Sequence, residues 1–175
     1  EGIYQHYKAV AEASSKPILL YNVPGRTSSN ISPDTVLRLS KVDNIIGIKE
    51  AAGDMEQVLR LLRILPEDFL VISGDDMLAL ALILAGGDGV ISVIGQAMAK
   101  DFSDMVHLGL EGKHKEAYKL HYKTMPLIDS IFEEGNPVGI KSLLSEIGIC
   151  NNVPRLPLVS ATEALYEKIK EKLKA

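Results

Sequence analysis

Four short apolar runs recur in the first 93 residues of the chain, each bounded by turn residues and separated by a segment with helical periodicity. They begin roughly 20 to 27 residues apart, the spacing expected of strands that alternate with helices. The runs are Ile18–Tyr21, Ile45–Ile48, Phe69–Ile72 and Val90–Val93. Because a short run that is apolar on both faces suits a strand buried on both sides, the pattern predicts βα units, a parallel sheet and an α/β fold.

Helix-start signals stand between the apolar runs, where the alternation requires helices. Ser32 can cap a helix through its hydroxyl, and Pro33 suits the first helical position because it has no N–H to satisfy. Asp54 is placed to cap the next helix, and Asp75 or Asp76 the one after it. Each apolar run therefore predicts a strand, and the segment after it predicts a helix.

The alternation stops after Gly112, and helical patterns continue to the end of the chain. These patterns cover residues 113–131, 137–147 and 160–173. We therefore predict a domain of βα units at residues 1–112 and a helical domain at residues 113–175.

Composition and charge argue against several kinds of partner. The net charge is −4 and the basic residues are scattered, unlike the basic stripe of a nucleic-acid-binding protein. No apolar run approaches the roughly 18 residues of a membrane span, and no charged-then-apolar leader is present. The single cysteine, Cys150, cannot form an internal disulfide and stands in a sequence typical of a helix end. We expect a cytoplasmic protein with no nucleic-acid or membrane partner.

The ends of the predicted strands are where chemistry is expected, because parallel barrels carry their active sites at the carboxyl ends of the strands. Lys49 ends the second run and is the only lysine in a strand position. In a barrel mouth a lysine is partly desolvated, which favours the neutral amine that can attack a ketone to form an imine. The alternative interpretation is a solvated lysine at a strand terminus.

Tyr21 and Arg26 follow the first run and could face the same mouth. A phenol such as that of Tyr21 can relay protons during imine formation, although a buried core tyrosine is the simpler interpretation. The guanidinium of Arg26 suits bidentate binding of a carboxylate, although an exposed loop arginine explains it equally well.

No pattern in the chain predicts a metal or a nucleotide cofactor. Asp75 and Asp76 follow Ser-Gly at a helix start, where aspartate usually caps. Three of the four histidines recur every seven residues, at His107, His114 and His121. On one helix such steps lie about 10 Å apart, too far to share a zinc ion. Gly86–Gly89 precedes a strand, which is the wrong order for a dinucleotide-binding loop.

Four short motifs together resemble the signatures of the dihydrodipicolinate synthase family of pyruvate-dependent class I aldolases and lyases, and the resemblance covers essentially the whole chain. The first is Tyr-Asn-Val-Pro-Gly-Arg-Thr at residues 21–27, and the second is Gly-Ile-Lys-Glu-Ala at residues 47–51. The others are Ser-Gly-Asp-Asp at residues 73–76 and Gly-Val-Ile-Ser-Val at residues 89–93, in the family's order and spacing.

This resemblance implies a TIM (β/α)₈ barrel of which the chain holds strands 5–8 and a C-terminal helical extension. It implies that Lys49 condenses with pyruvate, with no cofactor other than that covalent imine. Tyr21 matches the proton-relay tyrosine, and Arg26 the arginine that binds the carboxylate of L-aspartate 4-semialdehyde. Gly74 and Ile91 match positions whose backbone lines the pyruvate pocket. The implied product is 4-hydroxy-tetrahydrodipicolinate, in the diaminopimelate route to lysine.

Only half of the family's eight strands are present, and the chain begins at Glu1 without an initiator methionine. We therefore expect a fragment with little or no activity by itself. The resemblance places the pair of threonines that grips pyruvate, a second relay tyrosine and the lysine feedback site in the other half. It also implies a homo-oligomer, a homotetramer in most of the family.

Three alternatives stay open on the sequence alone. A sibling enzyme such as N-acetylneuraminate lyase or a keto-deoxy-sugar aldolase would keep Lys49 and Tyr21, but its relatives typically lack an arginine at the position of Arg26. A phosphate-binding barrel is disfavoured because Asp75 and Asp76 would repel phosphate. The third alternative is a non-catalytic half-barrel.

Overall fold

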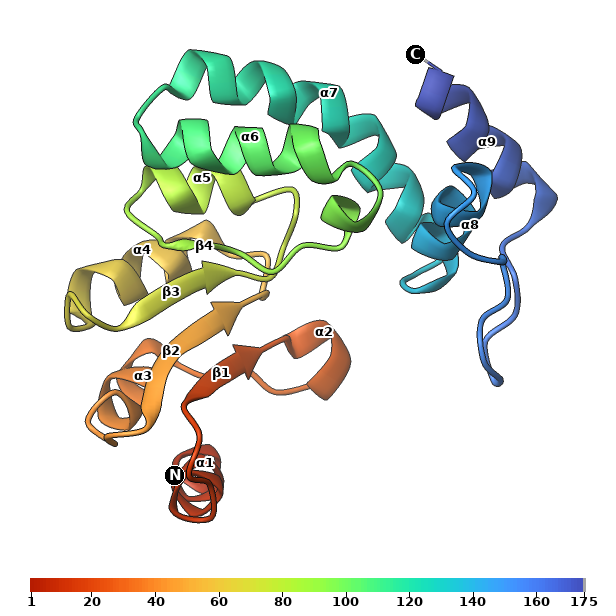
Figure 1. Cartoon of the computed structure of the whole chain (residues 1–175). Coiled ribbons are helices and arrows are strands. Elements are labelled where there is room, and N and C mark those ends of the chain that lie inside the picture. Colours follow the sequence, from red (N-terminus) through yellow and green to blue (C-terminus); the bar gives the residue numbers. More distant parts are fainter. Residues whose placement is uncertain (175) are drawn as a thin grey trace. The chain divides into compact units, whose positions relative to one another are not determined.

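The computed structural model describes residues 1–174 and contains a four-stranded parallel sheet in the order β1-β2-β3-β4 (Figure 1). The strands are β1 (Ile18–Asn22), β2 (Ile45–Glu50), β3 (Leu70–Ser73) and β4 (Gly89–Val90). All neighbouring pairs are parallel, so the predicted α/β architecture is confirmed. β2 carries one irregularity: Ile18 pairs with Ile45 but Leu19 pairs with Gly47, which leaves Ile46 as an extra residue in a bulge.

β4 is shorter than the predicted run Val90–Val93. The ladder ends where the Ile91 N–H donates to the Ser73 carbonyl at 2.9 Å. Directly afterwards the Ser92 hydroxyl accepts the N–H of Gly95 at 2.8 Å, and the 3₁₀ helix η1 (Ile94–Gln96) follows. A serine side chain that bonds its own backbone in this way competes with a strand ladder, which explains the early end.

The chain divides into two compact units, Glu1–Ile91 and a second one that begins at Ser92. This division comes earlier than the predicted domain boundary at residue 112, because the segment that begins at Ser92 packs with the later helices. The assignment of residues 1–112 to a barrel half and 113–175 to a helical domain stays a prediction about the family's domain plan.

The helices of the first unit are α1 (Gly2–Glu12), α2 (Pro24–Thr27), α3 (Pro33–Leu39), α4 (Met55–Ile64) and α5 (Ala79–Leu84). Ser32 caps α3 and Asp54 caps α4 through their side-chain oxygens, as the sequence predicts. Asp75 accepts the N–H groups of Met77 and Leu78 at 2.8 and 3.1 Å. It therefore caps a turn before α5, and the helix itself begins later than expected.

The core of the first unit lies against one face of the sheet. Leu20, Ile48 and Val71 are nearly inaccessible on that face and pack with apolar residues of α3 and α4. Side chains alternate along a strand, so Leu19 and Tyr21 point to the other face, where both are exposed. The sheet thus presents one buried face and one face that carries Tyr21.

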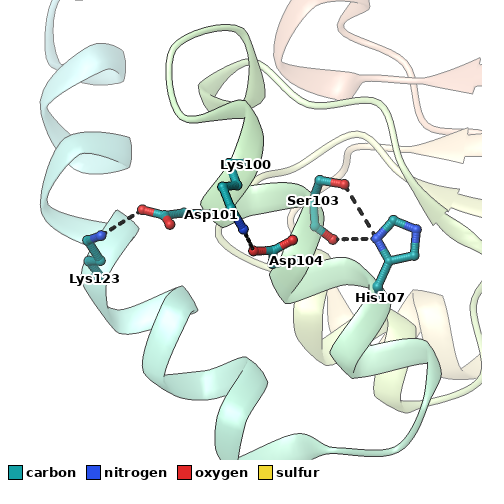
Figure 2. Close-up of polar contacts among 6 residues, drawn as sticks. All are labelled: Lys100, Asp101, Ser103, Asp104, His107 and Lys123. Atoms are coloured by element: carbon teal, nitrogen blue, oxygen red, sulfur yellow. Dashed lines mark hydrogen bonds and ion pairs between the residues drawn. The ribbon is translucent and has the colours of Figure 1, made fainter.

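The second unit consists of η1 and the helices α6 (Ala99–Leu110), α7 (His114–Glu133), α8 (Val138–Glu146) and α9 (Glu163–Lys174), close to the predicted ranges. α6 packs along α7, and Lys123 on α7 forms a 2.7 Å ion pair with Asp101 on α6 (Figure 2). Gly112 between them has φ +74°, a conformation that favours glycine. Among the helices that the structure describes, none is long and apolar enough to cross a membrane.

Candidate active site

Lys49 and Tyr21 form the centre of the candidate site. They are paired residues of the β1–β2 ladder near the carboxyl ends of both strands. The Lys49 Nζ lies 4.3 Å from the centroid of the Tyr21 ring, within the range of a cation–π contact. Lys49 is half-buried, whereas Tyr21 is 44% exposed. An amine and a phenol therefore share one side of the sheet, as a nucleophile and a proton relay require.

Gly74, which follows β3, bounds Lys49 on the other side. A Cβ at this position would lie 2.8 Å from the Lys49 Cε and 3.0 Å from its Cγ. It would also lie 2.8 Å from the Cβ of Ala51. The Gly74 N–H donates to the carbonyl of Glu50 at 2.7 Å, and this hydrogen bond holds the Gly74 backbone next to Lys49. The lysine chain thus runs between a tyrosine ring and a glycine that leaves it room.

Arg26 and Ile91, the other residues predicted for the site, lie in the segments after β1 and β4. Arg26 is exposed and stands in the short helix α2. Ile91 is 46% exposed, and its backbone is fixed by the hydrogen bond to Ser73. The structure places Tyr21 against Lys49 and Gly74 on the other side of that lysine. The roles predicted for all five site residues stay predictions.

A network of buried polar side chains lies behind Lys49 and was not predicted. Asn22 and Glu50 are the next pair of the same ladder, 1% and 3% exposed, and the Asn22 amide donates to both carboxylate oxygens. Gln57 on α4 donates to the same carboxylate at 3.0 Å. Asn30 joins Asn22 to Gln57 through further amide hydrogen bonds. The one sequence signal was a glutamate inside an otherwise buried strand end.

A cavity of about 340 Å³ lies next to this site, between α1, the end of β1 and the segment that follows. His6, Tyr7, Tyr21 and Thr27 are among its lining residues, and Lys49 is not. The Tyr7 hydroxyl donates to the Tyr21 carbonyl at 3.4 Å. Tyr21 therefore both lines the cavity and contacts the Lys49 amine, and the candidate site is centred on that contact.

The described residues contain no group of three or more His, Cys, Asp or Glu side chains that could hold a metal ion. His107 is exposed on α6 and donates from Nδ1 to the Ser103 carbonyl at 2.8 Å (Figure 2). His114 begins α7 and His121 lies buried within it, so the three histidines occupy two helices. Cys150 is exposed just after α8.

Comparison with known proteins identifies the family. The sequence profile of the dihydrodipicolinate synthetase family matches residues 1–175. The chain belongs to the dihydrodipicolinate synthetase family. The predicted family resemblance is therefore confirmed over the whole chain.

Curated members of the dihydrodipicolinate synthetase family are similar to this chain over nearly all of its length. The 4-hydroxy-tetrahydrodipicolinate synthase of Flavobacterium psychrophilum is 61% identical over 97% of the chain and 58% of its own length. The synthase of Archaeoglobus fulgidus is 44% identical over 100% of the chain and 61% of its own length. The chain therefore spans about three fifths of the length of these relatives.

Solved structures of the family have the same fold as this chain. Dihydrodipicolinate synthase of Thermotoga maritima superposes with a TM-score of 0.96 at 38% identity, covering 99% of the chain and 60% of that protein. The enzyme of Acinetobacter baumannii, solved in complex with pyruvate, gives a TM-score of 0.96 at 40% identity, with 99% and 60% coverage. The parallel sheet described above is therefore part of the family's fold.

Proposed function

We propose that this chain supplies the catalytic lysine of a 4-hydroxy-tetrahydrodipicolinate synthase, a lyase of lysine and diaminopimelate biosynthesis that condenses pyruvate with L-aspartate 4-semialdehyde. The observation that carries the proposal is the contact between the Lys49 amine and the Tyr21 ring at the carboxyl ends of paired strands. The pyruvate complex of the Acinetobacter baumannii relative supports pyruvate as the first substrate.

In the proposed reaction the neutral amine of Lys49 attacks the keto carbon of pyruvate, and the carbinolamine loses water to give an imine. Tyr21 carries protons to and from the oxygen that leaves. Loss of a proton from the pyruvate methyl group gives an enamine, which attacks the aldehyde carbon of the second substrate. The amino group of that substrate then displaces Lys49 and closes the ring. Arg26 holds the carboxylate of the semialdehyde.

The four strands would form half of an eight-stranded barrel, as strands 5–8, and a preceding segment would supply the rest. The relatives' greater length supports this arrangement. By itself the chain would have unpaired edges at β1 and β4 and an uncovered sheet face, a combination that promotes association. We propose that the full-length protein, meaning this chain together with that segment, is a cytoplasmic homo-oligomer and that the chain by itself is poorly active.

Borohydride reduction in the presence of pyruvate tests the lysine assignment. It converts the imine into a stable secondary amine that intact mass and peptide mass locate. We expect an adduct on Lys49 of the full-length protein, none in the Lys49→Arg variant and little on the chain by itself. A full-length protein without an adduct, or with one on another lysine, would overturn the assignment.

The acceptor is tested separately from the imine. With pyruvate supplied as the first substrate, consumption of L-aspartate 4-semialdehyde is compared with consumption of N-acetylmannosamine. We expect turnover with the semialdehyde and its loss in Arg26→Ala, because a guanidinium binds a carboxylate and alanine cannot. Preferential turnover of the sugar would assign the protein to the sibling lyases instead.

A further inference from the structure

Tyr21 and Lys49 are each followed in the chain by a residue of the buried polar network. Tyr21 pairs with Lys49 in the β1–β2 ladder, and Asn22 pairs with Glu50 one step further along. Because side chains alternate along a strand, the second pair points to the opposite face of the sheet. The hydrogen bonds between Asn22 and Glu50 therefore also fix the backbone that carries Tyr21 and Lys49.

The carboxylate of Glu50 is the centre of this network. Its Oε1 accepts the N–H of Ala52 at 2.7 Å and the Asn22 amide at 3.0 Å. Its Oε2 accepts the same Asn22 amide at 2.9 Å and the Gln57 amide at 3.0 Å. Both carboxylate oxygens thus accept hydrogen bonds from the protein. Because Glu50 is only 3% exposed, water has little access to replace a lost donor. Such a closed, buried set of hydrogen bonds fixes one geometry.

The network also holds the segment that carries Arg26. The side-chain carbonyl oxygen of Asn22 accepts the N–H of Ile31 at 2.9 Å, and the Asn22 amide donates to Asn30 at 2.7 Å. Asn30 is joined to Gln57 on α4 by two amide hydrogen bonds, at 2.8 and 3.2 Å. The segment after β1 therefore leaves from Asn22 and returns to it, with Arg26 between the two ends.

We propose that Glu50 is a positioning residue that, through Asn22 and Gln57, fixes Lys49 against Tyr21 and holds the Arg26 segment in one place. This inference rests on the proposed function, since it concerns how the same site is held. Glu50 touches neither substrate in this proposal and acts only through the strand ends and α4. Replacing Glu50 is expected to affect the rate of imine formation and the KM for L-aspartate 4-semialdehyde.

The test is Glu50→Gln in the full-length protein. Glutamine has nearly the same size and shape as glutamate, but one of the two acceptor oxygens of the carboxylate becomes an NH₂ donor. Either orientation of the new amide turns an NH₂ group toward an existing donor, so the network has to rearrange. Since a misplacement of about 1 Å can reduce a rate about 10²-fold, we expect borohydride trapping of pyruvate to slow by that order. The KM for L-aspartate 4-semialdehyde should rise as well.

The double variant Glu50→Gln, Gln57→Glu supplies the rescue. It exchanges carboxylate and amide within the network, so that the new amide at position 50 can donate to the new carboxylate at position 57. Position 57 lies in the first turn of α4, where the helix dipole favours a negative charge. We expect at least a tenfold recovery of the trapping rate. Glu56→Gln is the matched control, since Glu56 is exposed on the same turn and pairs with Arg60.

Each outcome has a defined meaning. If the unaltered full-length protein forms no adduct, the proposed function fails and this inference with it. If the adduct forms but Glu50→Gln traps pyruvate at the unaltered rate, this inference alone fails. A slow single variant that the double variant does not rescue also overturns it, whether or not the loss follows the unfolded fraction seen by circular dichroism. A slow, folded single variant with rescue supports it.

Discussion

Replacing Gly74 by alanine tests whether the room left for Lys49 matters for the reaction. Carbon atoms pack best about 3.5 to 4.0 Å apart, whereas the added Cβ would lie 2.8 Å from the Lys49 Cε and from the Ala51 Cβ. The Cε can swing aside, but the Ala51 Cβ moves only with its backbone. A shift of about 1 Å is therefore expected at the strand end that carries the amine.

A displacement of about 1 Å can cost about 10²-fold in rate, which corresponds to about 2.7 kcal/mol in activation free energy. We expect Gly74→Ala to slow borohydride trapping of pyruvate in the full-length protein by that factor. Gly2→Ala is the control, because no atom lies within 4 Å of the Cβ it would add. An unaltered trapping rate in folded Gly74→Ala would refute the reasoning, since it would mean that the lysine does not need this space.

Two further predictions concern stability. Leu20→Ala removes a fully buried side chain of β1 and should lower the free energy of unfolding by about 2–5 kcal/mol in denaturant titrations; the exposed Leu59→Ala should change it by no more than about 0.5 kcal/mol, and equal effects would contradict the core assignment. Hydrogen bonds from the hydroxyl and N–H of Thr162 lower the pKa of Glu134 below its ordinary value of 4.5, so the stabilisation is full above that value and is lost as pH falls through the lowered pKa. Thermal melts of the unaltered protein and Glu134→Gln should therefore differ at neutral pH and converge in acid, and a constant difference would contradict this.

The sheet and the proximity of Tyr21 to Lys49 could be predicted because their signals are local in the sequence. Short apolar runs bounded by turns set the strands, and Tyr21 and Lys49 each end a run. Since neighbouring parallel strands end at the same edge, their proximity followed from position and is confirmed by the 4.3 Å contact. The family motifs could be recognised for the same reason.

The remaining features depend on partners far apart in the sequence or on competing local bonds. The network around Glu50 was not predicted, because Gln57 reaches the carboxylate from α4 and Asn30 reaches Gln57 from the segment after β1. The early end of β4 depended on one serine hydroxyl, which periodicity cannot detect. These features arise from hydrogen bonds that a hydrophobic pattern does not encode.

The bulge at Ile46 separates the two halves of β2. Before it, Ile45 points into the core, and after it Ile48 does so although the two lie an odd number of positions apart. A regular strand of the same sequence would have to expose one of them. A one-residue insertion or deletion at this point should therefore leave the pairing of Lys49 with Tyr21 unchanged. Such a change would alter the part of β2 before the bulge and would not alter the end of the strand that carries Lys49.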